Sequence, residues 1–201
     1  MVPLNKDLTI YQGKTFEYPI KWESEPIVYK AITAITQAAP VKITAVGHGL
    51  PSGWRAAVIC AKGMQQINSL NAPPQDSDYH VVTRIDDDNV EFNEVSSACY
   101  RPYTSGGYLQ YYTPKDLTGY SAEMKVKDAV GGNTLLTLSS AINGGIFIDN
   151  PTKTIKLVLT AAQTAALVWS TGVYDLELTS PGGVVTALLY GNVTVTPEIT
   201  V

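Results

Sequence analysis

Charge, cysteine and histidine are all scarce in this sequence, and each scarcity argues against a class of protein. Only 16% of the 201 residues are charged, so the side chains that cover long solvated helices are lacking. The formal net charge of −4 is mild and no basic stripe is present, which argues against a nucleic-acid-binding protein. No apolar run reaches the length of about 18 residues that a membrane-spanning helix needs, so we expect none.

The two cysteines, Cys60 and Cys99, are too few for a disulfide framework, which favours synthesis in a reducing compartment. We expect both to be buried thiols, although a single bridge between them stays open. Cys60 lies in the apolar run from Arg55 to Ala61, which predicts a fully buried strand and an inert thiol. The first residues show no basic segment followed by an apolar core, so no signal peptide is expected.

Glycine and proline are plentiful, at 16 and 12 residues, and together with many Thr and Val residues they favour an all-β fold. The clearest strand follows the turn at Pro114 to Gly119, where Tyr120, Ala122, Met124 and Val126 alternate with polar residues. This pattern predicts a half-buried antiparallel strand. We expect it to pair with the alternating segment from Thr15 to Trp22.

Further strands and one helix are predicted on both sides of this strand. Pro19 has no backbone N–H, so the strand from Lys14 to Trp22 is expected at a sheet edge or with a bulge. Asn143-Gly144 predicts a hairpin, and Thr160 with Gln163 forms a capping-box pattern that predicts a helix from Ala161 to Leu167, ended by Gly172. The other expected strands are Asp7–Tyr11, Leu135–Leu138, the segment around Ile146 and Ile148, Thr154–Leu159, Val173–Thr179, Val184–Tyr190 and Val193–Thr196.

Residues 27–112 are less regularly patterned than the rest of the sequence and contain five or six short predicted strands, which suggests a small β-barrel or sandwich. The expected fold is therefore an all-β, discontinuous immunoglobulin-like β-sandwich formed by residues 1–26 and 113–201, with residues 27–112 inserted as a small β-barrel. Whole-domain insertion into a loop is tolerated because extra loop length costs little.

Several stretches of the discontinuous sandwich resemble a known family when they are taken in order. The stretches are DLTIYQGKTFEYPIKW, DLTGYSAEMKVKD, LLTLSSAINGGIFID, TIKLVLTAAQTAAL and GVYDLELTSPGGVVTALLYGNVTVTPEIT. They resemble phage virion modules similar to the N-terminal immunoglobulin-like domain of siphophage baseplate upper proteins. The break after Trp22 departs from that family, which runs there through a short loop into DLTGY.

The inserted segment has a resemblance of its own. VKITAVGHGLPSGWRAAV, INSLN, YHVVTRIDDDNVEFNEV and TSGGYLQ look like the β-barrel called the first catalytic cysteine half-domain of ubiquitin-activating enzymes, which recurs in phage tail proteins. This resemblance implies a fold and assigns no catalytic role to Cys60 or Cys99.

Candidate chemical sites are few. His48 and His80 could suggest a metal pair, but no Cys or carboxylate stands at ligand spacing, so a structural role is expected for His48. Asp86-Asp87-Asp88 lacks the spacing of a calcium loop and predicts a solvated turn. The glycine pairs do not open helices after strands, so no phosphate cradle is expected. We therefore predict no catalytic, cofactor-binding or metal-binding residue.

Tyrosines gather near the end of the insert, and Tyr100 and Tyr103 lie in an irregular polar segment with Arg101 between them. Tyrosine and arginine are enriched at protein interfaces, so Tyr100, Arg101 and Tyr103 are possible interface residues. For the tyrosines of this segment, core packing or local structure is favoured over an interface, and stacking against a glycan is the third interpretation.

The resemblances imply a non-enzymatic structural protein of a tailed phage virion, a connector or adaptor in the tail, baseplate or fibre-attachment region. We expect synthesis in the host cytoplasm, partners among other tail or baseplate proteins, and several copies on a symmetric ring, with strand addition at an edge such as that carrying Pro19. Because the sequence ends directly after the last predicted strand, a connector is favoured over a fibre tip. The alternatives are a glycan-binding attachment module, a capsid decoration protein and, last, an enzyme.

Overall fold

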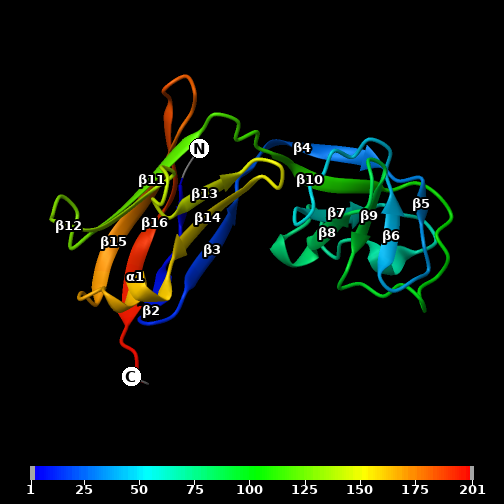
Figure 1. Ribbon diagram of the computed structural model, residues 1–201. Coiled ribbons are helices and arrows are strands. Elements are labelled where there is room, and N and C mark those ends of the chain that lie inside the picture. The colour runs from blue at the N-terminus through cyan, green and yellow to red at the C-terminus, as the bar shows by residue number, and fades with distance from the viewer. Residues whose placement is uncertain (1–2, 200–201) are drawn as a thin grey trace. The chain divides into compact units, whose positions relative to one another are not determined.

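The computed structural model describes residues 3–199, so the predicted outer ends of the sandwich at Met1 and Val201 lie outside the described residues. The fold is all-β, with one short α-helix and two short 3-10 helices in the described part of the chain (Figure 1). The chain divides into two compact units: residues up to Trp22 with those from Asp116 onward, and Glu23–Lys115. Each unit has its own hydrophobic core.

The first unit is a sandwich of two sheets. Its six-stranded sheet has the order β1-β16-β15-β11-β12, with β2 also paired to β16, and its three-stranded sheet has the order β13-β14-β3. The strands of the larger sheet are β1 (Leu4–Asn5), β2 (Leu8–Tyr11), β11 (Ser121–Lys127), β12 (Thr134–Ser139), β15 (Thr171–Thr179) and β16 (Val185–Thr196). Those of the smaller sheet are β3 (Phe16–Lys21), β13 (Ile146–Asp149) and β14 (Thr154–Leu159).

The faces of the sandwich strands follow the predicted alternation. In β11, Ala122, Met124 and Val126 are buried, and their polar neighbours point outward. In β15, Tyr174, Leu176 and Leu178 are buried in the same core. Because successive side chains point to opposite faces of a strand, the alternation of apolar and polar residues identifies the face of each strand that packs on the core.

The predicted pairing of β11 with β3 is wrong. β11 pairs antiparallel with β15 and β12, and β3 pairs antiparallel with β14 in the other sheet. The two segments nevertheless contribute to one core, where the rings of Trp22 and Tyr120 meet edge to face with centroids 5.8 Å apart. Both strands alternate because each covers the same core from an opposite sheet, and alternation alone does not identify a hydrogen-bonding partner.

The predicted hairpin at Asn143-Gly144 is also wrong, because β12 and β13 belong to different sheets. Asn143 does adopt the left-handed conformation, with φ of 62°, that such a turn requires. The turn therefore carries the chain from one sheet to the other.

β3 is an edge strand, as Pro19 predicts. Val158 donates its backbone N–H to Gly145, the residue before β13, so the preceding residue, Leu157, directs its backbone groups towards β3 and its partner Tyr18. Pro19 must then face the free edge, where its missing N–H removes no hydrogen bond from the sheet. The same missing donor makes this edge a poor template for strand addition.

The predicted helix is confirmed as α1 (Ala161–Ala165), with Thr160 as its N-cap. The Thr160 side chain accepts a hydrogen bond from the Gln163 N–H, and the Gln163 side chain accepts one from Thr160, which completes a capping box. The helix stops before Gly172, which instead lies in β15.

The second unit is a seven-stranded, curled sheet of order β4-β10-β7-β8-β9-β6-β5. Its strands are β4 (Glu23–Ala31), β5 (Ala34–Ile35), β6 (Val41–Thr44), β7 (Arg55–Ile59), β8 (His80–Arg84), β9 (Asn89–Phe92) and β10 (Tyr108–Pro114), and its 3-10 helices are η1 (Gln65–Ile67) and η2 (Asp76–Asp78). Trp54, Phe92 and Leu109 are among the buried residues of its core. The predicted junctions after Pro26 and before Thr113 fall inside β4 and β10, because these strands pair as far as Glu23 and Pro114.

Candidate interaction surfaces

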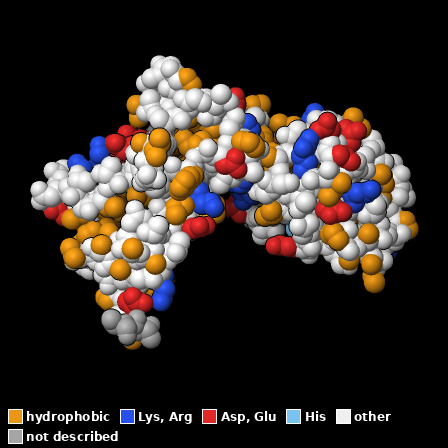
Figure 2. Space-filling view, viewed as in Figure 1, with side chains coloured by type: hydrophobic (Ala, Val, Ile, Leu, Met, Phe, Trp, Pro, Cys, Tyr) orange, Lys and Arg blue, Asp and Glu red, His pale blue; other side chains and the backbone are white. Residues whose placement is uncertain are grey.

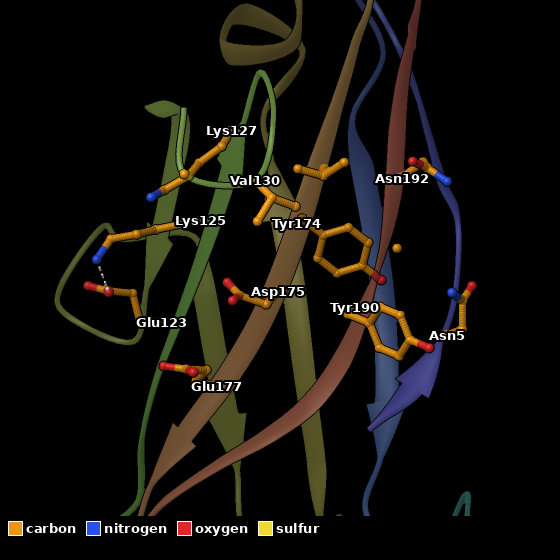
Figure 3. Close-up of a pocket in the computed structure, with 13 residues that line it drawn as sticks. Asn5, Glu123, Lys125, Lys127, Val130, Tyr174, Asp175, Glu177, Tyr190 and Asn192 are labelled. Carbon is orange, nitrogen blue, oxygen red and sulfur yellow. Dashed lines mark ion pairs between the residues drawn. The ribbon is translucent and has the colours of Figure 1, made fainter. Parts of the chain in front are cut away.

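The outer face of the six-stranded sheet carries an open depression of about 600 Å³ (Figure 3). β11 contributes Glu123, Lys125 and Lys127, and β15 contributes Asp175 and Glu177. The depression is completed by Asn5, Val130, Gly131, Val173, Tyr174, Tyr190, Gly191 and Asn192. Its charged side chains come from the outward positions of strands whose inward positions fill the core.

The register of the sheet arranges the charges of this depression. Lys125 lies opposite Asp175, and two like charges, Glu123 and Glu177, lie opposite each other. Glu123 turns along its own strand towards Lys125, at 2.6 Å (Figure 3). This contact, with the nearby Asp175 and Glu177 carboxylates, raises the pKa of Lys125. The depression thus presents both signs of charge over a broad face, which suits contact with another macromolecule.

The outer face of the three-stranded sheet carries a second depression, of about 560 Å³. Phe147 lies on this face with 58% of its surface exposed, beside Val158 of β14. Lys156 and Glu17 form an ion pair across the face at 3.4 Å. This face therefore combines an exposed aromatic side chain with an ion pair, and both kinds of group are found in protein interfaces.

The predicted interface residues Tyr100, Arg101 and Tyr103 all lie in the second unit. Tyr100 and Tyr103 are partly buried and pack against the core, whereas Arg101 is exposed. The Tyr103 hydroxyl lies 2.9 Å from the carbonyl oxygens of both Ile32 and Gly106, and burial raises its pKa. These tyrosines therefore hold the irregular segment on the curled sheet, while Arg101 extends from it.

His48 is a structural residue of a tight loop, only 2% exposed. Its Nδ1 accepts the Leu50 N–H at 2.9 Å and its Nε2 lies 3.1 Å from the Asp86 carbonyl, so the proton belongs on Nε2. Its own carbonyl accepts the hydroxyl of Tyr111. The other histidine, His80, stacks on Phe92 with ring centroids 5.0 Å apart.

The Asp86-Asp87-Asp88 segment is a turn whose carboxylates are engaged within the chain. Asp86 accepts hydrogen bonds from the backbone N–H groups of Asp88 and Asn89, which lower its pKa. Asp87 pairs with Arg84, and Asp88 accepts the Gly47 N–H. Among residues 3–199, no group of three or more His, Cys, Asp and Glu side chains is arranged to hold a metal ion.

Both cysteines are free and exposed, so the expectation of buried thiols is wrong. β7 ends at Ile59, and Cys60 turns out of the strand with a left-handed φ of 59°. Cys99 lies in the irregular segment before β10. The next residue of the run, Ala61, is buried although it lies beyond the strand, so the exposure of Cys60 comes from its own backbone turn, for which the residue type gives no sequence signal.

A cluster around Arg55 was not predicted from the sequence. Arg55 forms two hydrogen bonds with Glu23 and a third with Asp76, and its guanidinium lies 5.1 Å from the centroid of the Tyr79 ring. Gln110, almost fully buried, donates to the Tyr79 hydroxyl at 2.9 Å. These residues come from β4, β7, η2, the residue that follows η2, and β10, and no spacing in the sequence indicates that they meet.

On the face of the protein that Figure 2 shows, positive, negative and apolar side chains are interspersed. No helix in residues 3–199 has the length and apolar character needed to cross a bilayer. No protein-family model matches the chain, and no curated protein matches it.

Proposed function

We propose that this chain is a structural protein of a tailed phage virion, a connector or adaptor in the tail, baseplate or fibre-attachment region that acts through protein–protein contacts. The resemblance of five sandwich segments, in order, to baseplate upper protein modules supports this proposal, as does the resemblance of the insert to a barrel found in phage tail proteins. In this proposal the chain is not an enzyme.

The observation that carries the proposal is the exposed outer face of the three-stranded sheet, where Phe147 lies beside the Lys156–Glu17 pair. A partner that covers Phe147 would bury its apolar ring. Charges on that partner complementary to Lys156 and Glu17 would fix its orientation. The mixed charges on the outer face of the six-stranded sheet offer a second contact area. A protein with two such faces suits a position between neighbours in an assembly.

The proposal is tested by quantitative mass spectrometry of purified particles from a host strain that carries the gene, with capsids and tails separated before digestion. We expect the chain to follow the tail fraction in a small multiple of three or six copies. Copies that track capsid subunits would instead make it a decoration protein. Absence from particles would overturn the virion assignment.

A further inference from the structure

The long outer strand of the curled sheet, β4, keeps a free edge. Ile32 donates its N–H to Gly107, and in the antiparallel register with β10 this directs the backbone groups of Val28 and Lys30 towards β10 as well. Ile27, Tyr29 and Ala31 therefore direct their backbone groups away from β10. Within residues 3–199, the N–H and C=O groups of Tyr29 and Ala31 take part in no hydrogen bond that continues the sheet.

From Ile27 to Ala31, this edge has neither the proline nor the register shift found at the other long edge strands. β3 has Pro19 without a donor, and β12 has a register shift opposite Val126 and Lys127 that disturbs its spacing. β4 is also irregular near Pro26, but its pairing is continuous from Ile27 to Ala31. Tyr29 is exposed there by 53%.

We propose that the β4 edge pairs antiparallel with β4 of a second copy of this chain, in a register centred on Tyr29. In this register Tyr29 of one copy donates to the C=O of Tyr29 of the other, and Ala31 donates to the C=O of Ile27. The C=O of Ala31 faces the N–H of Ile27, which already donates to the Glu25 carboxylate at 3.1 Å, so this pair forms one hydrogen bond instead of two. Each free N–H of the regular part of β4 thus meets a free C=O.

Self-complementarity selects a second copy as the occupant and Tyr29 as the centre. The register places Lys30 opposite Val28, so no like charges face each other, whereas a register centred on Lys30 would oppose two ammonium groups. A register centred on Ala31 would place Tyr29 opposite Thr33, which lies beyond the end of β4 and already bonds to Thr44 at 2.9 Å. A two-fold axis at Tyr29 gives the same contacts to both copies, as a symmetric dimer requires.

The side chains of the outer surface add an aromatic contact to this pairing. Tyr29 and Tyr108 meet edge to face with centroids 6.4 Å apart, and Tyr108 is itself 45% exposed. Paired β4 strands would bring this tyrosine pair beside its symmetry mate, covering apolar ring surface that is exposed in the single chain. The inference stands on the geometry of β4 and does not depend on the virion proposal.

Crosslinking of the full chain tests the register. In a Cys60→Ser, Cys99→Ser background, the variant Tyr29→Cys places two thiols directly opposite each other, about 5.5 Å apart between Cα atoms, within reach of a disulfide. Lys30→Cys is the matched control, because its opposite residue is Val28. We expect a disulfide dimer from the first variant at least tenfold faster than from the second, and equal rates would overturn the register.

Sedimentation and hydrogen exchange of the unaltered chain test the pairing itself. We expect a concentration-dependent dimer in which the amides of Tyr29 and Ala31 become protected from exchange, and Tyr29→Pro to weaken association at least tenfold. Because this N–H faces the free edge, Tyr29→Pro removes no hydrogen bond within the chain. A chain that stays monomeric at millimolar concentration, or a dimer whose Tyr29 and Ala31 amides exchange freely, would overturn the proposal.

Discussion

Arg55 and Glu23 are joined by two parallel hydrogen bonds, 2.5 Å from Nε to Oε1 and 2.7 Å from Nη2 to Oε2. The pair links β7 to the first residue of β4, on opposite sides of β10. Lysine cannot reproduce the two-pronged geometry, so we expect Arg55→Lys to destabilise the second unit. Because the Arg55 side chain is 34% exposed, solvent screening keeps the expected loss of stability at about 1 kcal/mol.

The measurement is urea unfolding of Arg55→Lys, Glu23→Gln and the double variant, analysed as a thermodynamic cycle. Lys125→Arg, on an exposed face of the other unit, is the control for a basic substitution outside the pair. Additive effects of the two single variants would show that the pair contributes no coupling.

Asp78 gives the second unit an acid-sensitive contact. The Gln75 N–H, followed by the Asn71 side chain, lowers the pKa of Asp78 to about 2. A carboxyl whose pKa is depressed on folding contributes stability above its unfolded pKa, near 3.8, and loses it as pH falls towards 2. We therefore expect Asp78→Asn to lower stability at pH 7 and to flatten the loss of stability between about pH 4 and pH 2. Thermal unfolding across this range measures it, and parallel curves for the two proteins would contradict the assignment.

His48 is expected to matter for folding and His80 much less. His48→Ala leaves the Leu50 N–H and the Asp86 carbonyl without their partner in a buried loop, which should cost about 3 kcal/mol. His80→Ala removes a ring contact with Phe92 on a partly exposed strand and should cost about 1 kcal/mol. Chemical unfolding of both variants compares them directly. Equal losses would show that the His48 hydrogen bonds contribute little.

Substitution of Phe147 distinguishes a role in docking from a role in the stability of the fold. Since most of its surface is exposed, Phe147→Ser should change the free energy of unfolding by less than about 0.5 kcal/mol. If this face docks to a virion partner, the same variant should be incorporated into particles at least tenfold less efficiently. Val184→Ser, another exposed apolar residue, is the matched control. Normal incorporation of Phe147→Ser would remove this face from the proposed contact.

The sequence predicts strand faces well and strand partners poorly. Met124 and Leu176 could be assigned to the core because alternation is a local property of each strand. The pairing of β11 with β15 could not, because it depends on which of several amphipathic strands lies beside it. The capping box at Thr160 was predictable from two residues three positions apart, whereas the cluster at Arg55 requires contacts across 21 and 32 positions.

The pairing of Glu23 with Pro114 has a consequence for how the chain folds. Once the inserted unit has folded, the two ends it returns to the sandwich lie about 5 Å apart, the spacing of neighbouring strands. The two sandwich segments are then joined by a short connection instead of a long flexible loop. Most of the conformational entropy of loop closure was already lost when the insert folded. We therefore expect a defect confined to the insert to slow the association of the two sandwich segments as well. The same closeness of ends makes the position suitable for exchanging one inserted domain for another.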